Sequence, residues 1–157
     1  MSNEVEILLV EDSPEDVELT VRALRRNKIA NKIQVAEDGA EGLDFLLCRG
    51  PYKDRSFSCP PRLVLLDLKL PKVSGLEVLQ AIRADERTKA IPVVILTSSK
   101  EQKDVIMGYN LGVNAFVQKP VDFEKFGDAI RQIGMFWMLL NEAPPPPALG
   151  ASTAQGA

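Results

Sequence analysis

Residues 63–75 read LVLLDLKLPKVSG, a short apolar run that ends in a carboxylate. Four apolar residues lead into Asp67, and Pro71 then prevents the strand from continuing. A short apolar run closed by turn residues is typical of a fully buried strand in a parallel sheet. Such sheets bind ligands beyond the carboxyl ends of their strands, so Asp67 occupies a position at which chemistry is common. An ordinary loop aspartate would fit the same position, so other residues of the chain are needed to distinguish a functional aspartate from a loop aspartate.

The composition is that of one globular domain, with 157 residues and a net charge of -3. The negative charge disfavours nucleic acid as a partner. No apolar run approaches the roughly 20 residues of a membrane span, and the first residues lack the pattern of a signal peptide. Cys48 and Cys59 form neither a disulfide framework nor a metal-ligand spacing, and the chain has no histidine. We therefore expect a cytoplasmic protein without histidine-based chemistry and without a nucleic-acid or membrane partner.

Strand and helix patterns alternate five times along the chain. Buried-strand patterns occupy residues 5–10, 63–67, 93–97 and 115–117, and the alternation around residues 33–35 indicates a strand nearer the edge. Capping residues begin a helix after each strand, at Ser13, Asp38, Ser74, Ser99 and Asp122. The alternation predicts a doubly wound α/β fold with parallel strands. We expect the folded domain to span residues 1–141, followed by a Pro/Ala-rich disordered tail at 142–157.

Polar side chains follow four of the predicted strands: Glu11 and Asp12, then Asp67, Thr97 and Lys119. If the strand order is 2-1-3-4-5, the first and third strands are neighbours, and three carboxylates converge at one edge of the sheet. Carboxylates that close oppose one another's ionisation unless a cation compensates them. Oxygen ligands without histidine or cysteine suit Mg²⁺. The sequence therefore predicts a magnesium site held by the carboxylates.

A magnesium ion, an ammonium group and a hydroxyl form a site for a phosphoryl group. Asp67 is the predicted nucleophile, which would form an acyl phosphate, because it alone heads the central strand. Each residue has a plainer interpretation when taken singly. Glu11 and Asp12 could form a solvated turn before a helix, Thr97 could bond to its own backbone, and Lys119 could be a surface residue. Their shared position at the binding edge favours a site.

With these residues, the chain resembles the receiver (CheY-like) domain of two-component response regulators from Glu4 to about Leu140. The motifs that carry the resemblance are LVEDS at 9–13, LLDLKLPKVSG at 65–75, VILTS at 94–98 and FVQKP at 116–120. The resemblance implies a flavodoxin-like (βα)5 fold with strand order 2-1-3-4-5. It also implies that Asp67 accepts a phosphoryl group from a phosphohistidine of a sensor histidine kinase. Such a domain catalyses only its own phosphorylation and dephosphorylation.

The resemblance also implies the roles of further residues. The main-chain carbonyl of Lys69 would join the three carboxylates around Mg²⁺. Thr97 and Lys119 would bind the phosphoryl oxygens, and the peptide bond between Lys119 and Pro120 would be cis. Phe116 would occupy the aromatic switch position and work together with Thr97; it lacks the hydroxyl with which a tyrosine could form an outward hydrogen bond.

Two stretches resemble more narrowly the small regulators associated with bacterial and cyanobacterial phytochromes. These stretches are the loop at residues 52–61 and FWMLLNEAPP at 136–145. The resemblance implies a light-regulated histidine kinase, such as a bacteriophytochrome, as the phosphoryl donor. No output domain follows in this sequence, so we expect the signal to leave through a downstream protein target or a phosphotransferase.

The predicted last helix reaches about Asn141 and becomes apolar on all sides beyond Gly134. One face of a sheet cannot cover such a helix, and exposed apolar patches usually mark interfaces. We expect a homodimer through the fourth helix, fifth strand and fifth helix, with Phe136 and Trp137 near the centre of the interface.

Two other functions stay open on sequence alone. A Mg²⁺-dependent phosphohydrolase with an aspartyl intermediate would share Asp67 and the metal. Such enzymes usually have a second acid two residues after the nucleophile, where this chain has Lys69. A phosphorylation-independent binding module would be expected to lack part of the acidic cluster or Lys119, and this chain has all of them.

Overall fold

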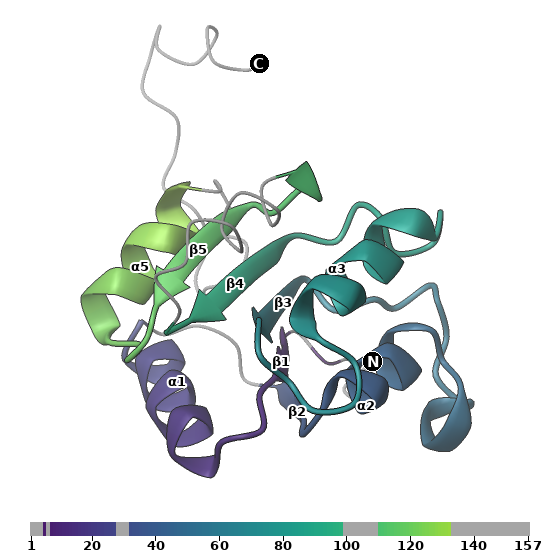
Figure 1. The fold of residues 1–157 in the computed structure, drawn as a ribbon, viewed down its shortest axis with the longest axis horizontal. Helices are drawn as coiled ribbons and strands as arrows, with labels where there is room; N and C mark the ends of the chain where they lie inside the picture. The colour runs from purple at the N-terminus through teal and green to yellow at the C-terminus, as the bar shows by residue number, and fades with distance from the viewer. Residues whose placement is uncertain (1–4, 6, 28–31, 99–109, 133–157) are drawn as a thin grey trace, which may run out of the picture.

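The computed structural model describes residues 5, 7–27, 32–98 and 110–132. Five strands form one parallel sheet in the order β2-β1-β3-β4-β5 (Figure 1). The strands are β1 (Ile7–Val10), β2 (Ile33–Ala36), β3 (Leu63–Asp67), β4 (Val93–Thr97) and β5 (Ala115–Gln118). The predicted flavodoxin-like fold and its strand order are therefore confirmed.

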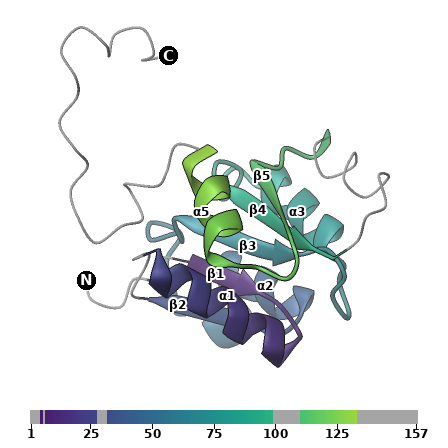
Figure 2. The same cartoon turned by 90° about the vertical axis from the view of Figure 1, so that its left-hand side faces the viewer.

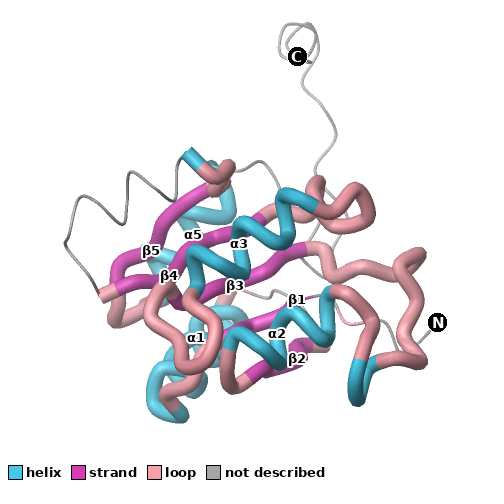
Figure 3. The backbone as a smooth tube through the Cα atoms, turned by 45° about the vertical axis from the view of Figure 1, so that its right-hand side comes forward, coloured by secondary structure: helices cyan, strands magenta, loops and turns pink. Residues whose placement is uncertain are grey.

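Helices cover both faces of the sheet. α1 (Pro14–Arg26) and α5 (Phe123–Gln132) lie side by side on one face (Figure 2). α2 (Gly39–Leu46) and α3 (Gly75–Ala84) lie on the other face, and a short 3-10 helix, η1 (Gly50–Tyr52), follows α2 (Figure 3). The fourth helix predicted from Ser99, and the part of the last helix predicted beyond Gln132, lie outside the described residues. None of the helices that the structure describes has both the length and the apolar character needed to cross a bilayer.

Successive strand residues point to opposite faces of the sheet and fill two separate cores. Ile7, Leu9, Leu63 and Leu65 pack with α1 and α5 in one core. Leu8, Val10, Val64 and Leu66 pack with α2 and α3 in the other. Burial on both faces explains why β1, β3 and β4 are continuous apolar runs. β2 is half-buried over most of its length, as expected of the edge strand predicted there.

Four of the predicted helix starts, at Ser13, Asp38, Ser74 and Asp122, are confirmed by the hydrogen bonds of their capping side chains, and the fifth, at Ser99, lies outside the described residues. The Ser13 hydroxyl accepts the N–H of Asp16 at 3.3 Å, and the Asp38 carboxylate accepts the N–H of Glu41 at 2.8 Å. Ser74 and the residue three positions later form a reciprocal capping box at the start of α3. These caps satisfy backbone donors that a helix cannot pair internally, and so they fix where each helix leaves the binding edge of the sheet.

Candidate functional site

The register of the sheet brings the predicted carboxylates together. Val10 of β1 pairs with Leu66 of β3, so Glu11 and Asp67 are the next residues of two neighbouring strands. Oxygen atoms of Glu11, Asp12 and Asp67 lie within 4.8 Å of one another. Glu11 and Asp67 are buried, whereas Asp12 is exposed. The three acids therefore form a cluster at the carboxyl edge of the sheet that opens to solvent at Asp12.

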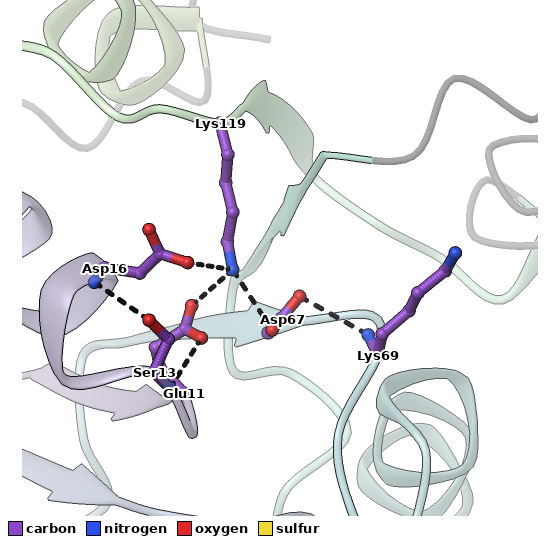
Figure 4. Close-up of polar contacts among 6 residues, drawn as sticks. All are labelled: Glu11, Ser13, Asp16, Asp67, Lys69 and Lys119. Carbon is purple, nitrogen blue, oxygen red and sulfur yellow. Dashed lines mark hydrogen bonds and ion pairs between the residues drawn. The ribbon is translucent and has the colours of Figure 1, made fainter.

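Lys119 enters this cluster from the end of β5 and carries its counter-charge (Figure 4). Its Nζ lies 2.7 Å from Glu11 Oε1, 3.0 Å from Asp16 Oδ2 and 3.1 Å from Asp67 Oδ2. The Lys119 side chain is only 10% exposed. The peptide bond between Lys119 and Pro120 is cis, as predicted. Lys119 therefore connects the carboxyl ends of β1 and β3, through Glu11 and Asp67, to the first turn of α1, through Asp16.

Asp16 is a site residue that the sequence analysis missed. Asp16 lies in the acidic first turn of α1, and acidic residues are common at helix starts. The turn that begins after Glu11 carries Asp16 back over the sheet edge, where its carboxylate meets Lys119. A helix that begins immediately after an acidic strand end is the signal that could have identified it.

Burial and charge determine the protonation of the cluster. Burial raises the pKa of Glu11 to about 7, with a further contribution from the charge of Asp67, against the opposing effect of the hydrogen bond from Lys119. Burial also lowers the pKa of Lys119, but its hydrogen bonds to Glu11 and Asp16 and the charge of Asp67 outweigh burial and raise this pKa. Lys119 is therefore a permanent cation in the site.

The remaining predicted residues lie at different distances from the site along the chain, and one of them contacts Asp67 directly. Asp67 Oδ1 accepts the N–H of Lys69 at 3.3 Å. Thr97 is the buried last residue of β4, and Asp67 pairs with the residue before it. Phe116 of β5 packs in the core formed with α2 and α3, and the alternation of β4 places Thr97 on that same face. Phe136 and Trp137, predicted at a dimer interface, lie outside the described residues.

The sequence matches the response regulator receiver domain over residues 7–131. The chain belongs to this family. The predicted resemblance is therefore confirmed, over most of the chain that the structure describes.

Relatives of this receiver domain include phytochrome regulators. The solved structure of the bacteriophytochrome response regulator RtBRR is 52% identical, with a TM-score of 0.79, and covers 90% of this chain and 85% of RtBRR. The response regulator Rcp1 of Synechocystis sp. is 39% identical over 132 residues, 84% of this chain and 88% of Rcp1. The probable methanogenesis regulatory protein FilR2 of Methanothrix harundinacea is 42% identical over 141 residues, 89% of this chain and 88% of FilR2.

The acidic cluster of this receiver domain fits a divalent cation. Its donors are all oxygen atoms, its three carboxylates lie within reach of one ion, and two of them are buried, where uncompensated charge is costly. A structure of Rcp1 is described as the Mn²⁺-bound form, and this relative is 37% identical with a TM-score of 0.71, covering 92% of this chain and 99% of Rcp1. The arrangement can hold a cation beside Asp67.

Proposed function

We propose that this protein is a response regulator in which Asp67 of the receiver domain accepts a phosphoryl group from a phosphohistidine of a sensor histidine kinase. The observation that carries the proposal is the contact of the Lys119 ammonium with both Asp67 and Glu11 inside the acidic cluster. An ordinary structural ion pair requires one carboxylate, whereas this lysine meets three at the edge where parallel sheets bind ligands.

In the proposed transfer, a carboxylate oxygen of Asp67 attacks phosphorus and forms a P–O bond. The P–N bond of the donor breaks, and its electron pair leaves with the imidazole nitrogen. The N–H of Lys69 orients Asp67 Oδ1, and Lys119 lies beside Oδ2, where it would pair with a phosphoryl oxygen. The Thr97 hydroxyl would donate to another phosphoryl oxygen.

Mg²⁺ is the proposed metal, and Glu11, Asp12, Asp67 and the main-chain carbonyl of Lys69 are its proposed ligands. Bound there, the ion would offset the negative charge of the carboxylates and of the entering phosphoryl group. The all-oxygen donor set supports a hard cation of this kind.

Thr97 and Phe116 are the proposed switch. They lie on the same face of neighbouring strands, with Phe116 half-buried. Movement of Thr97 toward the phosphoryl group would vacate space that Phe116 can fill, which would bias an existing equilibrium between two surface conformations.

A phytochrome-type histidine kinase is the proposed donor, supported by the 52% identity to RtBRR. The signal would then leave through a downstream protein or a phosphotransferase.

We also propose a homodimer with Phe136 and Trp137 near its centre, supported by the apolar sequence that follows Gly134. Light scattering tests it: the wild type should be dimeric at tens of micromolar and Phe136→Glu monomeric. A monomeric wild type, with or without phosphorylation, would contradict the dimer.

Intact-mass spectrometry after incubation with acetyl phosphate tests the proposed chemistry. The wild type should gain the mass of one phosphoryl group in the presence of Mg²⁺ and none in the presence of EDTA. Asp67→Asn should gain none, while Asp54→Asn, which removes the same charge from an exposed loop, should behave as the wild type. Labelling of Asp67→Asn to the wild-type level would contradict the proposal. Continuous release of phosphate from small phosphate esters would instead indicate a phosphohydrolase.

A further inference from the structure

The loop between β3 and α3, residues 68–74, contains a strained turn. Val73 donates its N–H to the carbonyl of Pro71 at 2.8 Å, and Lys72 between them has a φ of 68°. This is a γ-turn of the rare hand, which a residue with a Cβ adopts only when its surroundings enforce it. The same loop begins with Lys69, whose N–H binds Asp67. The strained residue Lys72 therefore lies three positions after Lys69 and five after Asp67.

The N-terminus of α2 holds this turn in place. A Cβ atom at Gly39 would lie 2.1 Å from the carbonyl oxygen of Val73, so only glycine permits the backbone contact observed. One residue earlier, the Asp38 carboxylate caps α2 and also pairs with Lys72, with 3.3 Å between Oδ2 and Nζ. Val73, the last residue of the turn, thus packs against the backbone of α2 at Gly39. Lys72, the central residue of the turn, forms an ion pair with Asp38, the cap of α2.

We infer that Asp38 and Gly39 are positioning residues for the divalent cation, acting through the loop that carries Lys69. The inference rests on the proposed function, in which the Lys69 carbonyl is a metal ligand. Asp67 and the start of α3 fix the two ends of the loop, while the contact with α2 fixes its middle. Release of that contact lets the γ-turn relax, and relaxation changes the direction of the preceding peptide units. Lys69 then loses the orientation that the metal needs.

Two substitutions separate this role from a simple effect of charge. Asp38→Asn keeps a good helix cap and removes the ion pair, and Lys72→Met removes the same ion pair from the other side. If charge alone acted on the metal, Asp38→Asn would weaken Mg²⁺ binding and Lys72→Met would strengthen it. If the loop is positioned by the contact, both substitutions weaken binding.

Calorimetric titration of the purified protein with Mg²⁺ measures the effect directly. Changes in the supports of metal ligands typically weaken affinity 10–100-fold, and because Lys72 is 69% exposed we expect roughly fivefold for each variant. The double variant should also lose about fivefold, because each substitution removes the same contact. Glu37→Gln, which removes an exposed carboxylate next to Asp38, should bind Mg²⁺ as the wild type does. Gly39→Ala should weaken binding more than either charge variant, because its Cβ displaces the loop backbone.

Three results would overturn the inference. One is tighter binding by Lys72→Met. Another is a lower melting temperature with an unchanged dissociation constant in both charge variants, which would indicate a merely structural contact. The third is a folded Gly39→Ala that binds Mg²⁺ as the wild type does; where this variant does not fold, the charge variants decide. Asp67→Asn is titrated in parallel, because wild-type affinity in that variant would instead contradict the proposed metal site itself.

Discussion

Replacement of Lys119 with methionine should slow phosphorylation of Asp67 without removing the nucleophile. Methionine keeps much of the length of the side chain and removes its charge. In the wild type, Lys119 Nζ lies 3.1 Å from Asp67 Oδ2, so an oxygen of a phosphoryl group entering at Asp67 would lie at a similar distance from the ammonium. The variant therefore lacks one cation beside the transferring group.

The size of the effect follows from this geometry. Two unit charges about 4 Å apart attract by roughly 4 kcal/mol at an effective dielectric constant of about 20. The charge of the phosphoryl group is spread over several oxygens, which reduces the attraction to roughly 3 kcal/mol. Because the Lys119 side chain is only 10% exposed, water recovers little of this loss. A change of that size in the barrier corresponds to a rate about 100-fold lower.

Initial rates of phosphorylation by acetyl phosphate at saturating Mg²⁺ measure this loss. Lys125→Met is the matched control, because it removes the same charge from an exposed position on α5. The control should react within about twofold of the wild type, as expected of a weak surface ion pair. A folded Lys119→Met that also reacts within about twofold would refute the assignment of Lys119 to the phosphoryl group.

Three further predictions concern stability, ionisation and signalling. Arg83→Met removes the hydrogen bonds of a guanidinium to three backbone carbonyls and should lower the free energy of unfolding in urea by about 2 kcal/mol. The control Arg22→Met breaks an exposed ion pair on α1 and should lower it by less than about 0.5 kcal/mol. Equal losses in the two variants would contradict this prediction. Burial, and then the hydrogen bond to Glu41, raise the pKa of Tyr52 to about 12. The stability that this shift contributes should be present below about pH 10 and be lost as the pH rises through 12. An ultraviolet difference titration against Tyr52→Phe measures this pKa. Thr97→Ala should still accept phosphate, but its partner binding should no longer respond to phosphorylation; a normal response would exclude the proposed relay.

The parts of the fold that the sequence predicted are those with local causes. The apolar run before Asp67 is buried on both faces, and such burial leaves a continuous pattern that is independent of the rest of the chain. Ser13 and Ser74 cap helices through hydrogen bonds within three residues. The acidic cluster was predictable because parallel strands bring their carboxyl ends to one edge.

The parts that the sequence could not predict depend on contacts between distant elements. Asp16 meets Lys119 across 103 positions of sequence, and this meeting depends on how α1 packs beside α5. The positive φ of Lys72 has no signal in its residue type, since glycine and asparagine are the residues usually found there. Gly39 could be predicted to lie at a helix start, but its contact with Val73 requires the relative placement of α2 and the loop after β3.

Chemical mapping of the phosphorylated residue tests the central claim most directly. The wild type is phosphorylated by a phosphohistidine donor in the presence of Mg²⁺, and borohydride then reduces an aspartyl phosphate to homoserine. Peptide sequencing by mass spectrometry should find homoserine at position 67 and at no other aspartate. Homoserine at Asp12 or Asp16, or an unmodified Asp67 in a protein that has gained a phosphoryl group, would contradict the account.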